Sequence, residues 1–190
     1  MLGRYGTDNE VAGWTASLAG GMPPRQVAVG FTNSLEHRIN QVDAFSRAFL
    51  HRATDPMAMN WVAELMAGVS EQTVSEQILN SPEYQAAHTD PALMIRDLYL
   101  DVLGRQGTTA EIGGWQSALA AGATRESVVA GFVQSAEAND QIVASLYATA
   151  LHRPREGQTA AIWTTLLEAN KSASDVANGI LSSPEFQQKS

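Results

Sequence analysis

The stretch from Trp115 to Glu137, WQSALAAGATRESVVAGFVQSAE, decides the fold. Trp115 and Leu119 lie four residues apart, and so do Val128 and Phe132. This spacing places each pair on one face of a helix. The stretch therefore predicts two consecutive helices rather than strands.

The residues between and after these pairs predict where the helices end and begin. Gly122 is of the residue type that best tolerates the left-handed backbone closing a helix. Thr124 is a good N-cap for the helix that follows, and Ser135 is a good N-cap for the next one. We predict a short helix starting near Trp115, a tight turn, a second helix and then a third, longer helix.

The same pattern recurs around every tryptophan of the chain, Trp14, Trp61, Trp115 and Trp163. Each is followed by leucine after four residues, valine after thirteen, Phe or Ile after seventeen, serine after twenty and glutamate after twenty-two. The residue at the predicted turn is Gly21, Gly68, Gly122 or Asn170. Two residues later, copies two to four have an N-cap, namely Ser70, Thr124 and Ser172. Copy one has Pro23 there, which breaks the capping pattern. Four sequence copies of one unit follow from these offsets.

The copies fall into two pairs. Residues 2–36 and 103–137 are identical at 16 of 35 positions, and copies two and four share Leu-His-Arg and Ser-Pro-Glu. An insertion around residues 88–91 marks the join between the pairs. We predict an all-α fold of four tandem repeats of about 50 residues, each with three helices, stacked on their neighbours. The expected organisation is residues 1–87 with repeats one and two and residues 88–190 with repeats three and four, as halves of one array.

The third helices are predicted over residues 39–50, 91–103 and 142–151, the second of them started by Asp90. Copy one has no such helix before its Gly-Arg, and copy four stops where the next one begins. We expect either that the chain belongs to a longer array or that its two ends dock on each other.

Composition excludes several classes of function. The net charge is −8, and the only lysines are Lys171 and Lys189, whereas a nucleic-acid backbone needs clustered cations. No apolar stretch approaches the roughly 20 residues of a membrane span. The absence of cysteine excludes a disulfide framework, a thiolate zinc site and a cysteine nucleophile. The N-terminus has no signal-peptide core, so we expect the signal of an exported protein to lie elsewhere in a longer parent protein or near the C-terminus.

An arginine precedes each tryptophan by nine or ten residues and is matched by the glutamate of Ser-x-Glu. These residues are Arg4, Arg52, Arg105 and Arg153, with Glu36, Glu83, Glu137 and Glu185. Guanidinium groups bind carboxylates or phosphates of sugars bidentately, so the arginines are candidates for ligand binding. The stronger interpretation is structural, with each arginine bridging to the glutamate of its own copy.

Other polar or aromatic signals are weaker. The tryptophans could stack on sugar rings, but their phase with leucine favours a core position. His37, His51, His88 and His152 lack metal-ligand spacing, and the Asp8–Glu10 loop has too few oxygen ligands for calcium, its counterpart being residues 109–111. We predict neither metal nor cofactor. No catalytic constellation is visible, and a repeated unit disfavours a single active site, so we predict that the protein is not an enzyme.

The pattern Leu103-Gly104-Arg105, Gly114-Trp115, Leu119, Gly122, Gly131-Phe132 and Ser183-Pro184-Glu185-Phe186 resembles a bacterial repeat family, the domain of unknown function DUF4214. The resemblance extends over all four copies. The chain departs from the family's Asp-Pro-Asp after Gly-Arg, which here reads Tyr5-Gly6-Thr7 or Gln106-Gly107-Thr108, and has His51 and His152 in place of glycine. The pattern is also similar to S-layer anchoring regions that bind lipopolysaccharide and to phycobilisome linker domains.

This resemblance implies a secreted or cell-surface bacterial protein without enzymatic activity. The first expectation is an anchoring or adhesion module that binds surface polysaccharide or lipopolysaccharide. The alternative is a scaffold or linker that binds neighbouring protein subunits. Neither reading involves nucleic acid or membrane insertion.

Overall fold

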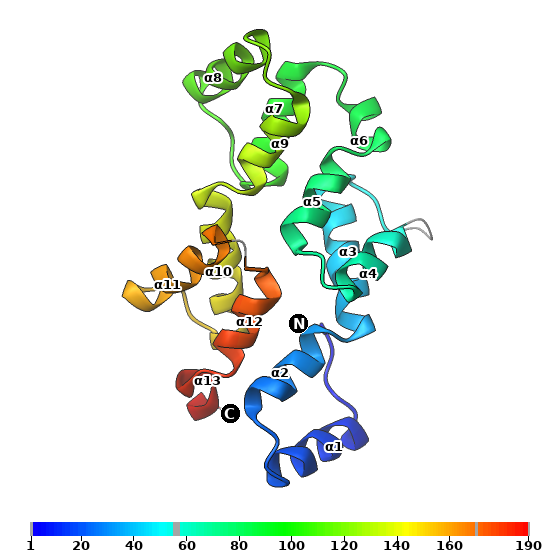
Figure 1. Ribbon diagram of the computed structural model, residues 1–190, viewed down its shortest axis with the longest axis vertical. Helices are drawn as coiled ribbons and strands as arrows, with labels where there is room; N and C mark the ends of the chain where they lie inside the picture. The colour runs from blue at the N-terminus through cyan, green and yellow to red at the C-terminus, as the bar shows by residue number, and fades with distance from the viewer. Residues whose placement is uncertain (1, 55–57, 170, 190) are drawn as a thin grey trace. The chain divides into compact units, whose positions relative to one another are not determined.

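The computed structural model describes residues 2–54, 58–169 and 171–189 of the chain. All regular secondary structure in these residues is helical, which confirms the predicted all-α class (Figure 1). Among the described residues, none of the helices has the length and apolar character needed to cross a membrane.

The helices follow the order predicted around each tryptophan. The tryptophan-bearing helices are α1 (Asp8–Ala19), α4 (Met59–Met66), α8 (Thr109–Ala120) and α11 (Gly157–Glu168). Each is followed by a nine-residue helix, namely α2 (Pro24–Thr32), α5 (Glu71–Leu79), α9 (Arg125–Val133) or α12 (Ala173–Leu181). The helices after Ser-x-Glu are α3 (Leu35–Phe49), α6 (Pro82–Ala87) with α7 (Pro91–Asp101), α10 (Ala136–Leu151) and α13 (Pro184–Lys189).

The insertion around residues 88–91 explains why α6 and α7 are separate helices. His88 ends α6, and the side chain of Asp90 accepts a hydrogen bond from the Ala92 amide as the N-cap of α7. Pro91 occupies the first turn, where its missing N–H costs nothing. The predicted start of this helix is therefore confirmed.

The turns between the first two helices also agree with the sequence. Gly21, Gly68 and Gly122 have φ of +91°, +91° and +100°, while Asn170 lies outside the described residues. The predicted caps Ser70, Thr124 and Ser172 accept hydrogen bonds from the amides of Thr73, Ser127 and Asp175. Pro23 caps α2 without a side-chain hydrogen bond.

The prediction that the first helix starts near the tryptophan is confirmed for α4, which begins two residues before Trp61, and is wrong for α1, α8 and α11. Both α1 and α8 begin six residues earlier, behind Thr7 and Thr108. Each threonine forms a capping box with a glutamate, Glu10 or Glu111, so that two backbone donors are satisfied at the helix start. The tryptophan consequently lies in the middle of its helix.

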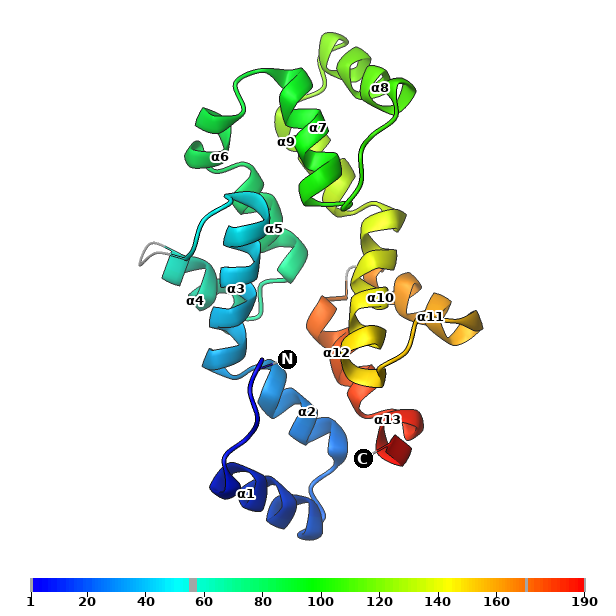
Figure 2. The same ribbon diagram turned by 180° about the vertical axis from the view of Figure 1, so that it is seen from behind.

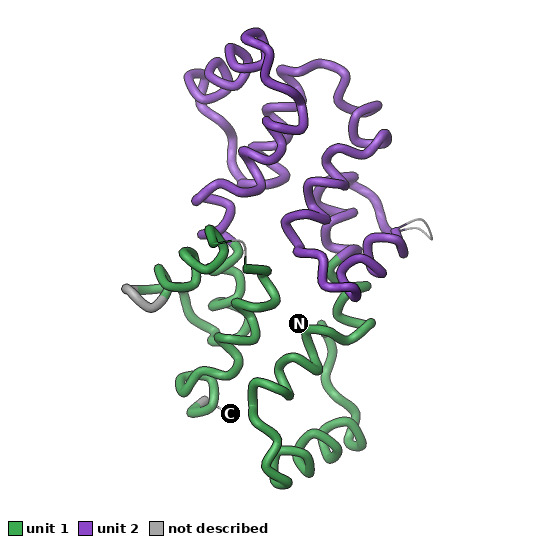
Figure 3. The backbone as a smooth tube through the Cα atoms, in the orientation of Figure 1, with its two compact units in different colours: residues 1–41, 142–190 green, residues 42–141 purple. Residues whose placement is uncertain are grey.

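The chain forms two compact units (Figure 3). Unit 1 comprises residues 1–41 and 142–190, and unit 2 comprises residues 42–141. This grouping differs from the expected halves, residues 1–87 and 88–190, because unit 1 combines sequence copies one and four while unit 2 combines copies two and three. The helices α3 and α10 each run from one unit into the other.

Each unit is organised around a pair of nine-residue helices. In unit 2, α5 packs against α9, and in unit 1, α2 packs against α12 (Figure 1, and from behind in Figure 2). The Thr32 hydroxyl donates to Oδ1 of Asn178 at 2.8 Å, and Nη1 of Arg38 donates to the Ser174 hydroxyl at 2.9 Å. The first and fourth sequence copies therefore dock on each other, one of the two expectations for the chain ends.

Each unit also has a hydrophobic core of its own. The core of unit 2 contains the fully buried Val74, Ile78, Ile95, Leu98 and Val128. A separate buried cluster in unit 1 contains Val143, Tyr147, Leu151, Val176 and Ile180.

Candidate functional site

The structure brings each predicted arginine to the glutamate of its own sequence copy. In copy one, Nε and Nη2 of Arg4 donate to Oε1 and Oε2 of Glu36 at 2.6 and 2.8 Å. The other three pairs have the same bidentate geometry, with distances of 2.5–2.9 Å, in Arg52–Glu83, Arg105–Glu137 and Arg153–Glu185. These planar forks fix the loop before each tryptophan helix to the start of the helix after Ser-x-Glu.

In copies one and three, a second carboxylate completes the arginine site. Nη1 and Nη2 of Arg105 donate to Oε2 and Oε1 of Glu111 at 3.1 and 2.7 Å, and Nη1 also donates to the Gln106 carbonyl. Together with Glu137, these contacts use all five N–H groups of the guanidinium. Arg4 is satisfied in the same way by Glu10, Glu36 and its neighbouring carbonyl, so neither arginine keeps a donor for a ligand.

The electrostatics of these pairs match their geometry. The hydrogen bonds from Arg105 and Thr108 lower the pKa of Glu111 to about 2. The hydrogen bond from Arg105 lowers the pKa of Glu137, and the two carboxylates together raise the pKa of Arg105. All three groups are therefore charged at neutral pH.

A tyrosine covers two of the four arginines. The guanidinium carbon of Arg105 lies 4.9 Å from the ring centre of Tyr99, and that of Arg153 lies 4.9 Å from the ring centre of Tyr147. Both tyrosines are nearly fully buried on the long helix that precedes the arginine. Their rings add a cation–π contact to each ion pair.

The residue before each arginine has a left-handed backbone in all four copies. The φ angles are +71° at Gly3 and +60° at Gly104, but also +52° at His51 and +50° at His152. Histidine is strained in this region, whereas glycine is not. Histidine in place of glycine at this position therefore changes the side chain but leaves the turn unchanged.

Three of the four tryptophans lie against a glycine of the following helix. A Cβ atom at Gly30 would approach Cη2 of Trp14 to 2.6 Å, and one at Gly131 would approach Cη2 of Trp115 to 2.6 Å. Trp163 covers Gly179 equally closely. Copy two has Gln77 at this position, and its tryptophan packs instead against the core of unit 2. The tryptophan rings therefore contribute to the packing between helices, in agreement with the core position predicted from the sequence.

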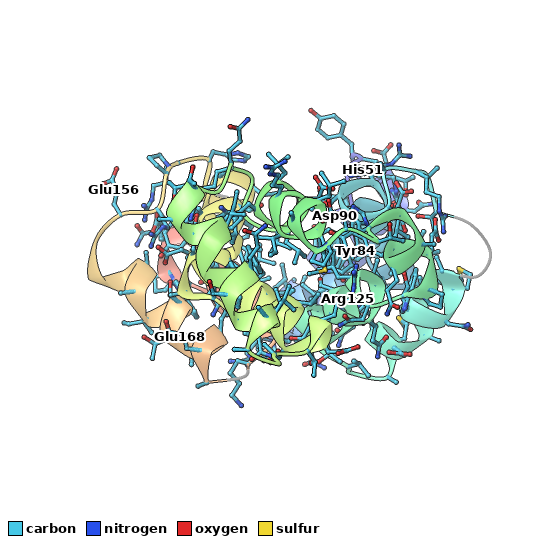
Figure 4. All side chains as sticks on the ribbon, turned by 90° about the horizontal axis from the view of Figure 1, so that it is seen from above. His51, Tyr84, Asp90, Arg125, Glu156 and Glu168 are labelled. Carbon is cyan, nitrogen blue, oxygen red and sulfur yellow. The ribbon has the colours of Figure 1, made fainter. Side chains whose placement is uncertain are left out.

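Unit 2 also contains a partly buried polar cluster beside the insertion, of which Figure 4 labels Tyr84 and Arg125. The Tyr84 ring stacks on His88 with ring centres 3.9 Å apart, and Nη1 of Arg125 donates to the His88 carbonyl at 3.0 Å. Nε2 of His88 lies 3.1 Å from Oδ2 of Asp97. This cluster joins α6, α7 and α9.

Asp101, at the end of α7, is an acid of unit 2 whose pKa is raised rather than lowered. Burial raises the pKa of Asp101 to about 6, and its Oδ2 has no hydrogen-bond partner among the described residues. Oδ1 lies 3.6 Å from Nε2 of His51. The carboxyl is consequently poised to titrate just below neutral pH.

The structure does not bring the four histidines together. His51 and His88 face different aspartates, while His37 is buried on α3 and His152 lies in unit 1. Within the described ranges, no group of three or more metal-ligating side chains occurs. Glu10, from the loop considered for calcium, is bound to Arg4 and Thr7 instead.

Two cavities open in unit 1. The larger, of about 510 Å³, has mostly apolar walls formed by α1, α2, α10, α12 and α13, including Leu18, Val27, Phe31, Leu181 and Phe186. The smaller, of about 280 Å³, is lined by Leu2, Arg4, Gly6, Glu10, Val11, Trp14 and Phe31. Phe31 lines both, so the two cavities adjoin along α1 and α2.

Several of these residues escape the sequence reasoning. The second carboxylates Glu10 and Glu111 could have been found from the Thr-x-x-Glu capping signature that starts at Thr7 and Thr108. The glycines under the tryptophans recur sixteen residues after Trp14, Trp115 and Trp163, which is a detectable offset. The larger cavity has no sequence signal, because its walls come from both the first copy and the C-terminal part of the chain.

Comparison with known proteins gives one match. No curated protein and no solved structure matches the chain. The family model described as Domain of unknown function (DUF4214) matches residues 75–142, which run from α5 into α10. The resemblance to DUF4214 seen in the repeat pattern is therefore confirmed over residues 75–142.

Proposed function

We propose that the protein is a non-catalytic helical scaffold that binds segments of other proteins through the apolar cavity of unit 1. The body of this scaffold is four three-helix repeats arranged as two pairs. Support comes from the equal length of α2, α5, α9 and α12 and from the same bidentate Arg–Glu fork in every sequence copy.

The observation that carries the proposal is the chemistry of the larger cavity. Its walls include Leu18, Val27, Phe31 and Phe186, and its volume of about 510 Å³ is within the range of ligand pockets. Leu18 is 44% exposed, so apolar area faces solvent at the rim. Apolar concave surface of this kind suits the side chains of a protein segment better than the hydroxyl groups of a sugar.

The residues that suggested glycan binding are engaged within the fold. Arg4 and Arg105 use all five N–H groups on carboxylates and a carbonyl. Trp14, Trp115 and Trp163 cover glycines of the next helix. This is why the scaffold alternative now ranks above polysaccharide or lipopolysaccharide binding.

Glycan binding stays the second candidate, together with a secreted or cell-surface setting. Both rest on the resemblance to DUF4214, whose model matches residues 75–142. If the protein binds a glycan, the contacts must come from side chains other than the four arginines and the packed tryptophans.

The test uses a peptide library displayed on phage and selected on the folded 190-residue chain. The same chain is titrated with bacterial surface polysaccharide by calorimetry. We expect peptides that bind the wild type and lose at least tenfold in affinity for Leu18→Glu, which places a charge at the cavity. Ile162→Glu is the matched control, because Ile162 is 59% exposed on α11 and does not line the cavity.

Peptides that bind both variants equally would contradict the role of the cavity. Saturable heat with polysaccharide and no selected peptide would reverse the order of the two candidates.

A further inference from the structure

Unit 1 and unit 2 share a layout, but among the described residues unit 2 contains one more helix. In unit 2, α7 packs against α8 and α9. The counterparts of α8 and α9 in unit 1 are α1 and α2, since residues 2–36 align with residues 103–137. Among the described residues of unit 1, no helix takes the place of α7 on α1 and α2.

The smaller cavity of unit 1 corresponds to the site of Tyr99 in unit 2. Tyr99 meets Phe132 edge to face with ring centres 4.7 Å apart, and its ring faces the guanidinium of Arg105. A Cβ atom on Gly107 would lie 2.5 Å from Cδ2 of Tyr99, so the ring rests directly on that glycine. The aligned residues of unit 1 are Phe31, Arg4 and Gly6, and all three line the 280 Å³ cavity.

The larger cavity corresponds to the site of the rest of α7. It is lined by Pro24, His152 and Phe186, which align with Arg125, His51 and Tyr84 around α7 in unit 2. Nε2 of His51 lies 3.6 Å from Oδ1 of Asp101 on α7. His152 can therefore face an acid on a helix in the cavity as His51 faces Asp101.

Residues that α7 covers in unit 2 are more buried than the aligned residues of unit 1. Val128 is 0% and Phe132 is 2% exposed, whereas the aligned Val27 and Phe31 are only half-buried. Val11 of α1 is 55% exposed, whereas the aligned Ile112 packs against the core of unit 2. The apolar surface left uncovered in unit 1 is thus the surface that α7 covers in unit 2.

We propose that the two cavities of unit 1 form one docking groove for a helix of the α7 type, supplied by a second protein molecule. This inference rests on the proposed scaffold function and names its partner. The helix carries Leu-Tyr, as in Leu98-Tyr99, and an acid two residues after the tyrosine, as in Asp101. It ends before the position of Leu103, because Leu2 of unit 1 already occupies that place. The tyrosine enters the smaller cavity on Gly6, and the acid meets His152.

Electrostatic complementarity supports this occupant. Arg4 presents a cation to the smaller cavity, which suits the negative π face of tyrosine. His152 at the larger cavity suits an aspartate at the position of Asp101. The apolar face between them matches Ile95 and Leu98, which are fully buried in unit 2.

The test titrates a fluorescent peptide of residues 89–102, TDPALMIRDLYLDV, into the full chain and follows anisotropy. The peptide keeps the Asp90 cap of α7. We expect saturable binding that weakens at least tenfold when the peptide carries Tyr99→Ala. Equal binding of both peptides would contradict insertion of the tyrosine.

Two variants of α1 and its loop locate the site on the protein. Gly6→Ala places a methyl group where the tyrosine ring would rest, and its only close neighbour is Cγ2 of Val11 at 3.2 Å. We expect Gly6→Ala to weaken peptide binding at least tenfold. Gly13→Ala is the control, because nothing lies within 4 Å of a Cβ there, and it should bind as the wild type does.

A short peptide can fail to bind simply because it does not form a helix in solution. A fusion protein avoids this problem. Residues 89–102 replace Met1, so that they precede Leu2 as they precede Leu103 in unit 2. We expect amide exchange in α1 to slow at least tenfold, and Tyr→Ala in the added segment to abolish the gain. Unchanged exchange in α1, together with no peptide binding, overturns the groove. Library peptides sensitive to Leu18→Glu would still support the scaffold.

Discussion

The residue before each repeated arginine must adopt a left-handed backbone, and the chain uses glycine twice and histidine twice to do so. A non-glycine residue in this conformation costs about 1 kcal/mol. At His51 and His152 the arginine that follows holds the turn in place through its bidentate contact with glutamate.

Replacing His152 with glycine should relieve this strain. We expect His152→Gly to raise the free energy of unfolding by about 1 kcal/mol in urea denaturation. Gly104→Ala is the opposite exchange at the aligned position, where φ is +60°, and should lower it by a similar amount. Changes of the same sign in both variants would mean that backbone strain does not govern this turn.

Arg105 should be irreplaceable by lysine, even though lysine keeps the charge. Lysine has no planar fork and cannot reach Glu111 and Glu137 bidentately at once. We expect Arg105→Lys to lower the thermal midpoint clearly more than Arg47→Lys, because Arg47 is exposed and its partner Asp43 lies on the same helix. Equal drops in calorimetry would show that the fork adds no more than a surface ion pair.

At the residue level, the sequence predicted the partners Arg4–Glu36 and Arg105–Glu137 because their offsets are constant in every copy. It did not predict that Glu10 and Glu111 would close the guanidinium. The reason is that their role in the capping box and their role at the arginine coincide only once the loop has folded.

At the level of elements, the contact between tryptophan and glycine sets how closely two consecutive helices approach. Glycine in a helix interior is unfavourable by about 1 kcal/mol relative to alanine. Its presence in α2, α9 and α12 is explained by the ring that lies on it. Helix propensity and packing therefore oppose each other at this position.

Gly131→Ala and Gly113→Ala separate these two effects. At Gly131 the new methyl group would meet Cη2 of Trp115 at 2.6 Å, and we expect a net loss of about 1–2 kcal/mol in stability. Gly113, on α8, has no neighbour within 4 Å, and Gly113→Ala should gain about 0.5–1 kcal/mol. Urea denaturation of both proteins is the measurement, and a gain at Gly131 would disprove the packing argument.

The elements were largely predictable because their signals are local. Caps such as Asp90 and Ser172 and the turn glycines Gly68 and Gly122 act within a few residues of themselves. The pairing of α2 with α12 was left open, because apolar periodicity identifies a buried face but not the helix that covers it.

At the level of the whole molecule, unit 2 is one continuous segment with its own core. We expect a fragment of residues 35–151, which keeps α3 and α10 whole, to unfold cooperatively in denaturant. Circular dichroism followed through a urea titration tests this. A gradual transition without a baseline would show that unit 2 depends on unit 1.

Two groups of carboxyls should change the stability in opposite directions as the pH falls. Asp101 has a folded pKa of about 6, above its ordinary 3.8, so its protonation stabilises the fold as pH falls from about 6 to about 4. Glu111 and Asp43 have folded pKa values of about 2, below 4.5 and 3.8, so their stabilising charge is lost as pH falls further. We expect maximal stability near pH 4–5.

Asp101→Asn should remove the gain in stability that the wild type shows between about pH 6 and about pH 4. At pH 7.5 the variant should be more stable than the wild type by on the order of 2 kcal/mol, and the difference should vanish by about pH 4. Urea titrations at several pH values measure this. A constant difference across the range would refute the assignment to titration of Asp101.

Because α2 pairs with α12, the two partners are synthesised at very different times. Thr32 and Asn178 are separated by 146 residues, so α2 leaves the ribosome long before its partner is made. At ordinary elongation speeds the delay is on the order of ten seconds. The contacts of unit 2 are complete by residue 141, well before unit 1 can close. A nascent chain therefore exposes the apolar face of α2 throughout this interval, and that face is the part of the molecule most in need of a chaperone.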